Sequence, residues 1–143
     1  MKHSLMKTAP ILLGIAAVLA CGDSTSPGST PVGSYTAIIF VTSDVNGPTN
    51  QLALGATLQI SLAANGTTSG HLHVPASGAQ PVFDADMAGT WTQNGEVIDF
   101  SQTADTFVRN MPFTIQRIST SVSALVGDKV FLGTRINVTL AHD

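Results

Sequence analysis

Apolar and polar residues alternate along most of the chain beyond residue 33. Runs in which every second residue is apolar recur about every 10–15 residues, and none keeps the spacing of an amphipathic helix. Alternation of this kind places the apolar side chains on one face of a strand. The pattern predicts eight strands, over residues 34–42, 56–63, 67–74, 83–92, 97–102, 112–118, 120–126 and 130–140.

Neighbouring predicted strands are joined by short connections, which is typical of an all-β meander. We therefore predict an eight-stranded antiparallel up-and-down barrel, because closure removes the sheet edges. The alternative is an immunoglobulin-like β-sandwich, which would require Greek-key crossings between two sheets. The agreement between neighbouring apolar faces favours the barrel.

Two turns set the predicted registers. A two-residue Asn94-Gly95 turn would pair Gln93 with Glu96 and place Trp91 opposite Ile98. For the hairpin around residues 64–66, a three-residue loop with a left-handed glycine buries the apolar residues of both strands together. That choice places Leu58 opposite Leu72 and Gln59 opposite His71.

The final hairpin is predicted to turn at residues 127–129, the sequence "GDK". Val126 would then face Val130, and the last strand would alternate without a break. Its predicted inward residues are Val130, Leu132, Thr134, Ile136, Val138 and Leu140. The same alternation predicts that Phe131 points outward.

The first 32 residues have a different character. Lys2 and Lys7 precede the apolar run of residues 11–20, which is too short to span a bilayer but suits a signal peptide. The run ends in "VLAC", and this resembles the bacterial lipoprotein signal, in which the cysteine, here Cys21, is lipidated. Residues 21–32 are rich in Ser, Thr, Pro and Gly and predict a tether. The predicted organisation is a signal peptide over 1–20, a lipidated tether over 21–32 and a barrel over 33–143.

The predicted location is a bacterial membrane, reached through the lipid on Cys21. Gly22 resembles the outer-membrane sorting pattern, so we expect the barrel to face the periplasm or the cell surface. Once residues 1–20 are removed, nine acidic residues outnumber the remaining basic residues, Arg109, Arg117, Lys129 and Arg135. No basic stripe exists, which disfavours nucleic acid as a partner.

Four segments of the predicted barrel resemble the small lipocalin-like domains of bacterial lipoproteins. They are "GSY" (33–35), "LAANGTTSG" (62–70), "MAGTWTQNGEVIDF" (87–100) and "LGTRINVTL" (132–140). The resemblance implies a barrel that holds a small apolar molecule. The inward aromatic and sulfur-containing side chains are the candidate ligand contacts: Tyr35, Phe83, Met87, Trp91, Phe100 and Phe113. The alternative function is a structural or interaction module of an envelope complex, with a filled barrel core.

A second candidate site lies in "HLH" and "DAD". If Val74 faces Phe83, then His73 lies opposite Asp84 and His71 opposite Asp86 on the outer face of the barrel. Two imidazoles and two carboxylates could bind Zn²⁺ or Cu²⁺. The alternative is ordinary cross-strand pairing on a solvated sheet face.

Catalysis has little support in the sequence. No G-x-S-x-G, phosphate-cradling or H-E-x-x-H motif occurs. The paired aspartates lie on strands and loops predicted to be exposed, where nothing would raise the pKa of one carboxyl above that of the other. We expect no enzymatic activity and no cofactor.

Overall fold

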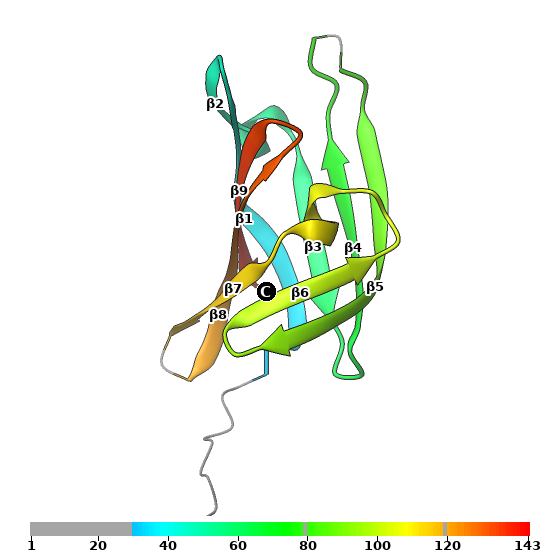
Figure 1. The fold of residues 1–143 in the computed structure, drawn as a ribbon, viewed down its shortest axis with the longest axis vertical. Coiled ribbons are helices and arrows are strands. Elements are labelled where there is room, and N and C mark those ends of the chain that lie inside the picture. The colour runs from blue at the N-terminus through cyan, green and yellow to red at the C-terminus, as the bar shows by residue number, and fades with distance from the viewer. Residues whose placement is uncertain (1–29, 79, 119) are drawn as a thin grey trace, which may run out of the picture.

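The computed structural model describes residues 30–78, 80–118 and 120–143, which form an almost entirely β structure (Figure 1). The strands are β1 (Gly33–Asp44), β2 (Gly47–Asn50), β3 (Thr57–Leu62), β4 (Thr67–Val74), β5 (Phe83–Asn94), β6 (Val97–Gln102), β7 (Phe113–Ile118), β8 (Ser121–Phe131) and β9 (Thr134–His142). Two short 3-10 helices, η1 (Leu52–Leu54) and η2 (Phe107–Asn110), interrupt them. The predicted signal peptide, Cys21 and the tether up to residue 29 lie outside the described residues.

The strands close into an antiparallel barrel. From β3 to β9 each strand pairs with the next along the chain, and β1 closes the circle by pairing with both β3 and β9. β2 adds a ninth strand on the edge of β1. The prediction of an eight-stranded up-and-down barrel is therefore confirmed, and the sandwich alternative is wrong. In the part of the chain that the structure describes, no helix is long and apolar enough to cross a membrane.

The short strand β2 and the helix η1 were not predicted. The sequence of β2, "GPTN", contains no apolar residue of the strand-forming type, so alternation gives no signal. Pro48 has no N–H to donate and is therefore tolerated only on an edge strand, which is what β2 is.

Two predicted registers on the β3–β4–β5 side are confirmed. Leu58 pairs with Leu72 and Gln59 with His71, around a loop in which Gly66 has a φ of 81°. The pairing of β4 with β5 places His73 opposite Asp84, as the matching of apolar faces predicted.

The β5–β6 turn differs from the prediction by one position. Asn94 pairs with Val97, so the turn residues are Gly95 and Glu96, not Asn94 and Gly95. Gly95 occupies the first turn position with a φ of 62°, where glycine is free of the steric cost that a side chain would bring. The pairing shifts by two residues, so Trp91 faces Phe100 rather than Ile98, and every side chain keeps its predicted face.

The prediction for the final hairpin was wrong. β8 continues through residues 127–129, and the chain turns instead at Leu132 and Gly133, both at positive φ. Gly127 serves close packing rather than a turn, since a Cβ there would collide with the Sδ atom of Met111. Positive φ is uncommon for leucine, so the sequence carries little signal for this turn.

This shift reverses several predicted faces. Val130 and Leu132, predicted to point inward, are exposed, whereas Phe131, predicted to point outward, packs against the core. The later part of the strand keeps its predicted face, because Ile136, Val138 and Leu140 are buried.

The two ends of the barrel differ. At the closed end lie the start of β1, the β3–β4 turn and the end of β9, where Tyr35 pairs with His142 (Figure 1). At the open end lie the β1–β2 turn, the β4–β5 connection and the β8–β9 turn. The described chain therefore starts and finishes at the end of the barrel opposite these three connections.

Candidate functional site

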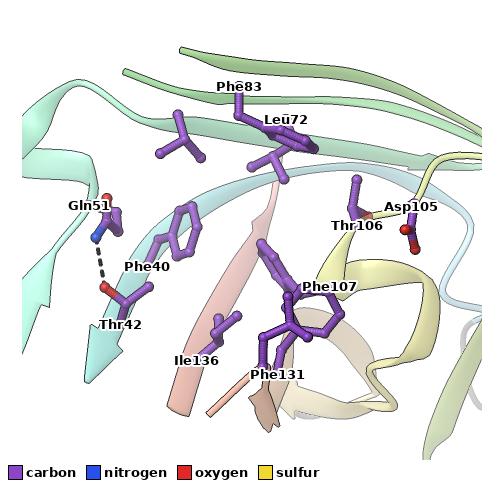
Figure 2. Close-up of a pocket in the computed structure, with 12 residues that line it drawn as sticks. Phe40, Thr42, Gln51, Leu72, Phe83, Asp105, Thr106, Phe107, Phe131 and Ile136 are labelled. Carbon is purple, nitrogen blue, oxygen red and sulfur yellow. Dashed lines mark hydrogen bonds between the residues drawn. The ribbon is translucent and has the colours of Figure 1, made fainter. Parts of the chain in front are cut away.

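A cavity of about 400 Å³ lies inside the open end of the barrel (Figure 2). Six large apolar side chains provide most of its wall: Phe40, Leu72, Phe83, Phe107, Phe131 and Ile136. The volume falls within the range typical of small-molecule sites, about 300–1,000 Å³.

The strands position most of these side chains through alternation, and a bulge positions Phe40. Tyr35 and Phe40 are both buried although they are five positions apart, which in a regular strand would place them on opposite faces. The pairing of β1 with β9 shifts register between Ala37 and Ile39, which turns the following residues onto the opposite face. The bulge therefore brings Phe40 into the barrel above Tyr35.

The helix η2 forms the floor of the cavity. Figure 2 shows Phe107 reaching from η2 towards Phe40, and their ring centroids lie 5.4 Å apart. Val108 and Met111 of the same segment are fully buried below. The hydroxyl of the buried Thr106 donates to Met87 Sδ at 3.7 Å, which ties this segment to β5. η2 thus separates the cavity from the packed closed end.

Polar groups lie at the mouth. The Gln51 Nε2 group donates a hydrogen bond to Thr42 Oγ1 at 2.7 Å, as the dashed line in Figure 2 marks. Asp105 also lines the cavity, and its carboxylate is 88% exposed. The cavity wall is therefore mainly apolar, and the buried Thr106 is the polar residue in it away from the rim.

A second space of about 500 Å³ lies outside the first and shares Thr42, Gln51, Val74 and Phe83 with it. Its outer wall comes from β2, η1 and the β4–β5 connection, and includes Asp44. The shared lining shows that this space adjoins the cavity.

Of the six predicted ligand contacts, only Phe83 lines the cavity. Four others, Tyr35, Met87, Phe100 and Phe113, are buried in the packed part of the barrel. Trp91 is half-buried against the same core, and its Nε1 group donates to the Ala63 carbonyl at 3.0 Å.

Sequence reasoning missed Phe40, Phe107 and Phe131. To predict that Phe40 lines the cavity, the bulge in β1 must be known. To predict the same of Phe131, the turn of the last hairpin must be placed correctly. Phe107 lies in a segment without alternation, and the available signal was the adjacent apolar pair Phe107 and Val108 between predicted strands.

The histidine and aspartate pairs lie on the outer face, as predicted. The His71 Nδ1 atom is 2.8 Å from Asp86 Oδ1, and His73 Nδ1 is 2.6 Å from Asp84 Oδ1. His71 Nε2 also lies 3.4 Å from Asp84 Oδ1. The hydrogen bond to Asp86 raises the pKa of His71, and Asp84 contributes in the same direction. The hydrogen bond from His73 lowers the pKa of Asp84.

This geometry is that of cross-strand ion pairs. Nδ1 of each imidazole lies within hydrogen-bond distance of a carboxylate oxygen on the neighbouring strand, as in other cross-strand polar pairs. Over residues 30–78, 80–118 and 120–143, no group of three or more His, Cys, Asp or Glu side chains is arranged to hold a metal ion.

The structure thus defines a closed β-barrel with an apolar cavity at one end. Comparison of the chain with protein-family models, with curated proteins and with solved structures finds no match in any of the three.

Proposed function

We propose that this chain is a non-enzymatic binding protein whose lipocalin-like barrel holds one small apolar molecule in the cavity at its open end. The observation that carries the proposal is a solvent-accessible cavity of about 400 Å³ with phenylalanine side chains from β1, β5, β8 and η2 in its wall. An apolar wall gives water few hydrogen-bond partners, so an apolar guest that displaces that water gains free energy.

The proposal places the barrel in the bacterial envelope. The lipoprotein-like signal and Cys21 support a lipid anchor that faces the periplasm or the cell surface, most simply at the outer membrane. Cell fractionation tests this part separately. A Cys21→Ala variant should leave the membrane fraction, and continued membrane association of that variant would contradict the anchor.

The binding proposal is tested with the neutral dye N-phenyl-1-naphthylamine, whose fluorescence increases in apolar surroundings. We expect the purified protein to bind one dye molecule saturably. Val74 lines both parts of the cavity, so Val74→Trp should fill the mouth and weaken dye binding at least about tenfold.

Ile118→Trp is the matched control, because Ile118 is exposed at the far end of β7 and lines neither space. It should bind the dye as the unsubstituted protein does, and circular dichroism should show both variants folded. Absence of saturable dye binding, or equal weakening by both substitutions, would contradict the proposal.

A second candidate function is an interaction module of an envelope complex. Exposed apolar side chains on the open-end connections favour it, notably Val45 in the β1–β2 turn and Leu132 in the β8–β9 turn, which is 90% exposed. Under this alternative the dye would not enter the cavity, and Val45→Ser, at a position that lines neither space, would release a protein partner.

A further inference from the structure

We infer that the cavity selects apolar molecules whose polar end is neutral or positively charged, such as a hydroxyl or a protonated amine, and discriminates against carboxylates. The inference rests on the proposed function, and it concerns the chemistry of the mouth rather than the existence of the cavity.

The uncharged polar groups in the lining do not discriminate between ligands. The Gln51 Nε2 group donates one of its two N–H groups to Thr42 Oγ1, which leaves its second N–H and the Thr42 hydroxyl as donors and the Gln51 Oε1 atom as an acceptor. Asp105 adds a carboxylate, which can only accept while it is ionised. Discrimination against a carboxylate must therefore come from charge.

The charges around the mouth have the same sign. Asp105 lines the inner cavity and Asp44 lines the adjoining space, while none of the described lining residues is a lysine, arginine or histidine. Arg109 lines neither space, and its Nη1 atom lies 3.6 Å from Asp105 Oδ1. This pairing offsets part of the charge of Asp105.

The depth of the cavity offers an anionic head group no alternative position. Phe40, Phe107 and Ile136 surround the interior, and a carboxylate buried among them would lose its hydration without gaining a partner. An anionic ligand must therefore hold its charge near solvent, where Asp105 lines the cavity and Asp44 lines the adjoining space. Interactions between exposed charges change binding by about tenfold at most, and salt screens the effect.

The experiment measures displacement of bound N-phenyl-1-naphthylamine near neutral pH by three molecules of equal chain length: 1-decanol, decylamine and decanoate. We expect decanol and decylamine to displace the dye at similar concentrations, and decanoate to require about tenfold more. Raising the salt from about 0.05 M to about 0.5 M should reduce the difference between decylamine and decanoate.

A double variant tests the origin of the selectivity. Asp44→Asn with Asp105→Asn should bring the displacement by decanoate to within about twofold of that by decylamine, with the decanol result unchanged. Asp99→Asn is the control, since Asp99 is an exposed carboxylate on β6 that lines neither space. It should retain the full discrimination.

The outcomes separate the two claims. If the dye binds and decanoate displaces it as readily as decylamine, the inference is wrong while the binding function stands. If the discrimination persists in the double variant, the two aspartates do not cause it and the inference is likewise overturned. If the dye itself fails to bind, the proposed function fails.

Discussion

The two ends of this barrel are built from the same strands and the same alternation, yet one is filled and the other is hollow. In the filled part, Tyr35, Phe113 and Met87 belong to one core cluster and are fully buried. At the open end, Phe40, Phe107 and Phe131 line a space that they do not fill. Eight strands enclose a lumen that side chains can just fill, so small differences in side-chain position decide between packing and a cavity.

The filling of the closed end depends on the segment between β6 and β7. Val108 and Met111 enter the barrel from this segment, and Phe100 and Phe113 pack edge to face there with centroids 5.6 Å apart. At the open end the same segment contributes only Phe107 and residues close to the rim of the cavity. The comparison indicates that η2 divides the barrel into a structural part and a binding part.

The largest expected effect comes from truncating one phenylalanine at each end. Phe113→Ala leaves a cavity in a packed core and should lower the free energy of unfolding by about 3–5 kcal/mol. Phe131→Ala enlarges an existing cavity and should cost less than about 2 kcal/mol. Urea unfolding measures both, and equal losses would show that the two ends are packed alike.

A smaller loss is expected from Gly127→Ala. The added methyl group would collide with the Met111 side chain and press on the ring of Phe113, which overpacks the closed end by about 1–3 kcal/mol. Gly95→Asn is the matched control, because asparagine tolerates positive φ and nothing lies near a Cβ at that position. A thermal melt of Gly127→Ala that coincides with that of the control would contradict the close packing.

Tyr35 reports on the closed end through its ionisation. Burial raises the pKa of its hydroxyl to about 12, and that hydroxyl donates to the Pro31 carbonyl at 2.7 Å. In the unfolded chain the Tyr35 hydroxyl ionises near pH 10. The contribution of the buried, neutral hydroxyl to the stability of the fold is therefore complete below that pH and is lost as the pH rises towards 12. Tyr35 is the only tyrosine, so phenolate absorbance follows it alone.

We expect that absorbance to rise together with unfolding rather than ahead of it. Tyr35→Phe should remove the alkaline loss and lower the stability at neutral pH by about 1 kcal/mol, because the Pro31 carbonyl loses its donor. Ionisation of the folded protein near pH 10 would mean that the closed end admits solvent.

The smallest effect concerns the outer face. The pKa of His71 lies above its ordinary value of 6.5, so its pairing stabilises the fold below that pH and is lost as pH rises through the folded value. The pKa of Asp84 is lowered, so its contribution to stability has the opposite pH dependence and is lost on strong acidification. An NMR titration of Asp86→Asn should show the pKa of His71 returning towards 6.5, and an unchanged value would contradict the pairing.

Much of the architecture could be predicted, and the exceptions have physical causes. Apolar alternation found each barrel strand, and the matching of apolar faces fixed the β3–β4 and β4–β5 registers. The prediction of the last hairpin failed because Gly127, a strand glycine that allows the close approach of Met111, resembled a turn residue. The actual turn contains Leu132 at positive φ.

The candidate site was harder to predict than the fold. Alternation identifies the inward residues but does not show where the lumen is filled, since that depends on the path of the segment around η2. The bulge in β1 likewise changes the face of Phe40 without a clear mark in the sequence. Phe83 was identified because it belongs to a strand whose register was correct.

The most direct test of the central claim is methyl NMR spectroscopy of the protein titrated with N-phenyl-1-naphthylamine. The account predicts chemical-shift changes at Leu72, Val74 and Ile136, which line the cavity, and little change at Leu62 and Leu140 in the packed core. Changes confined to Leu62 and Leu140, or no saturable change at all, would contradict the assignment of binding to the open end of the barrel.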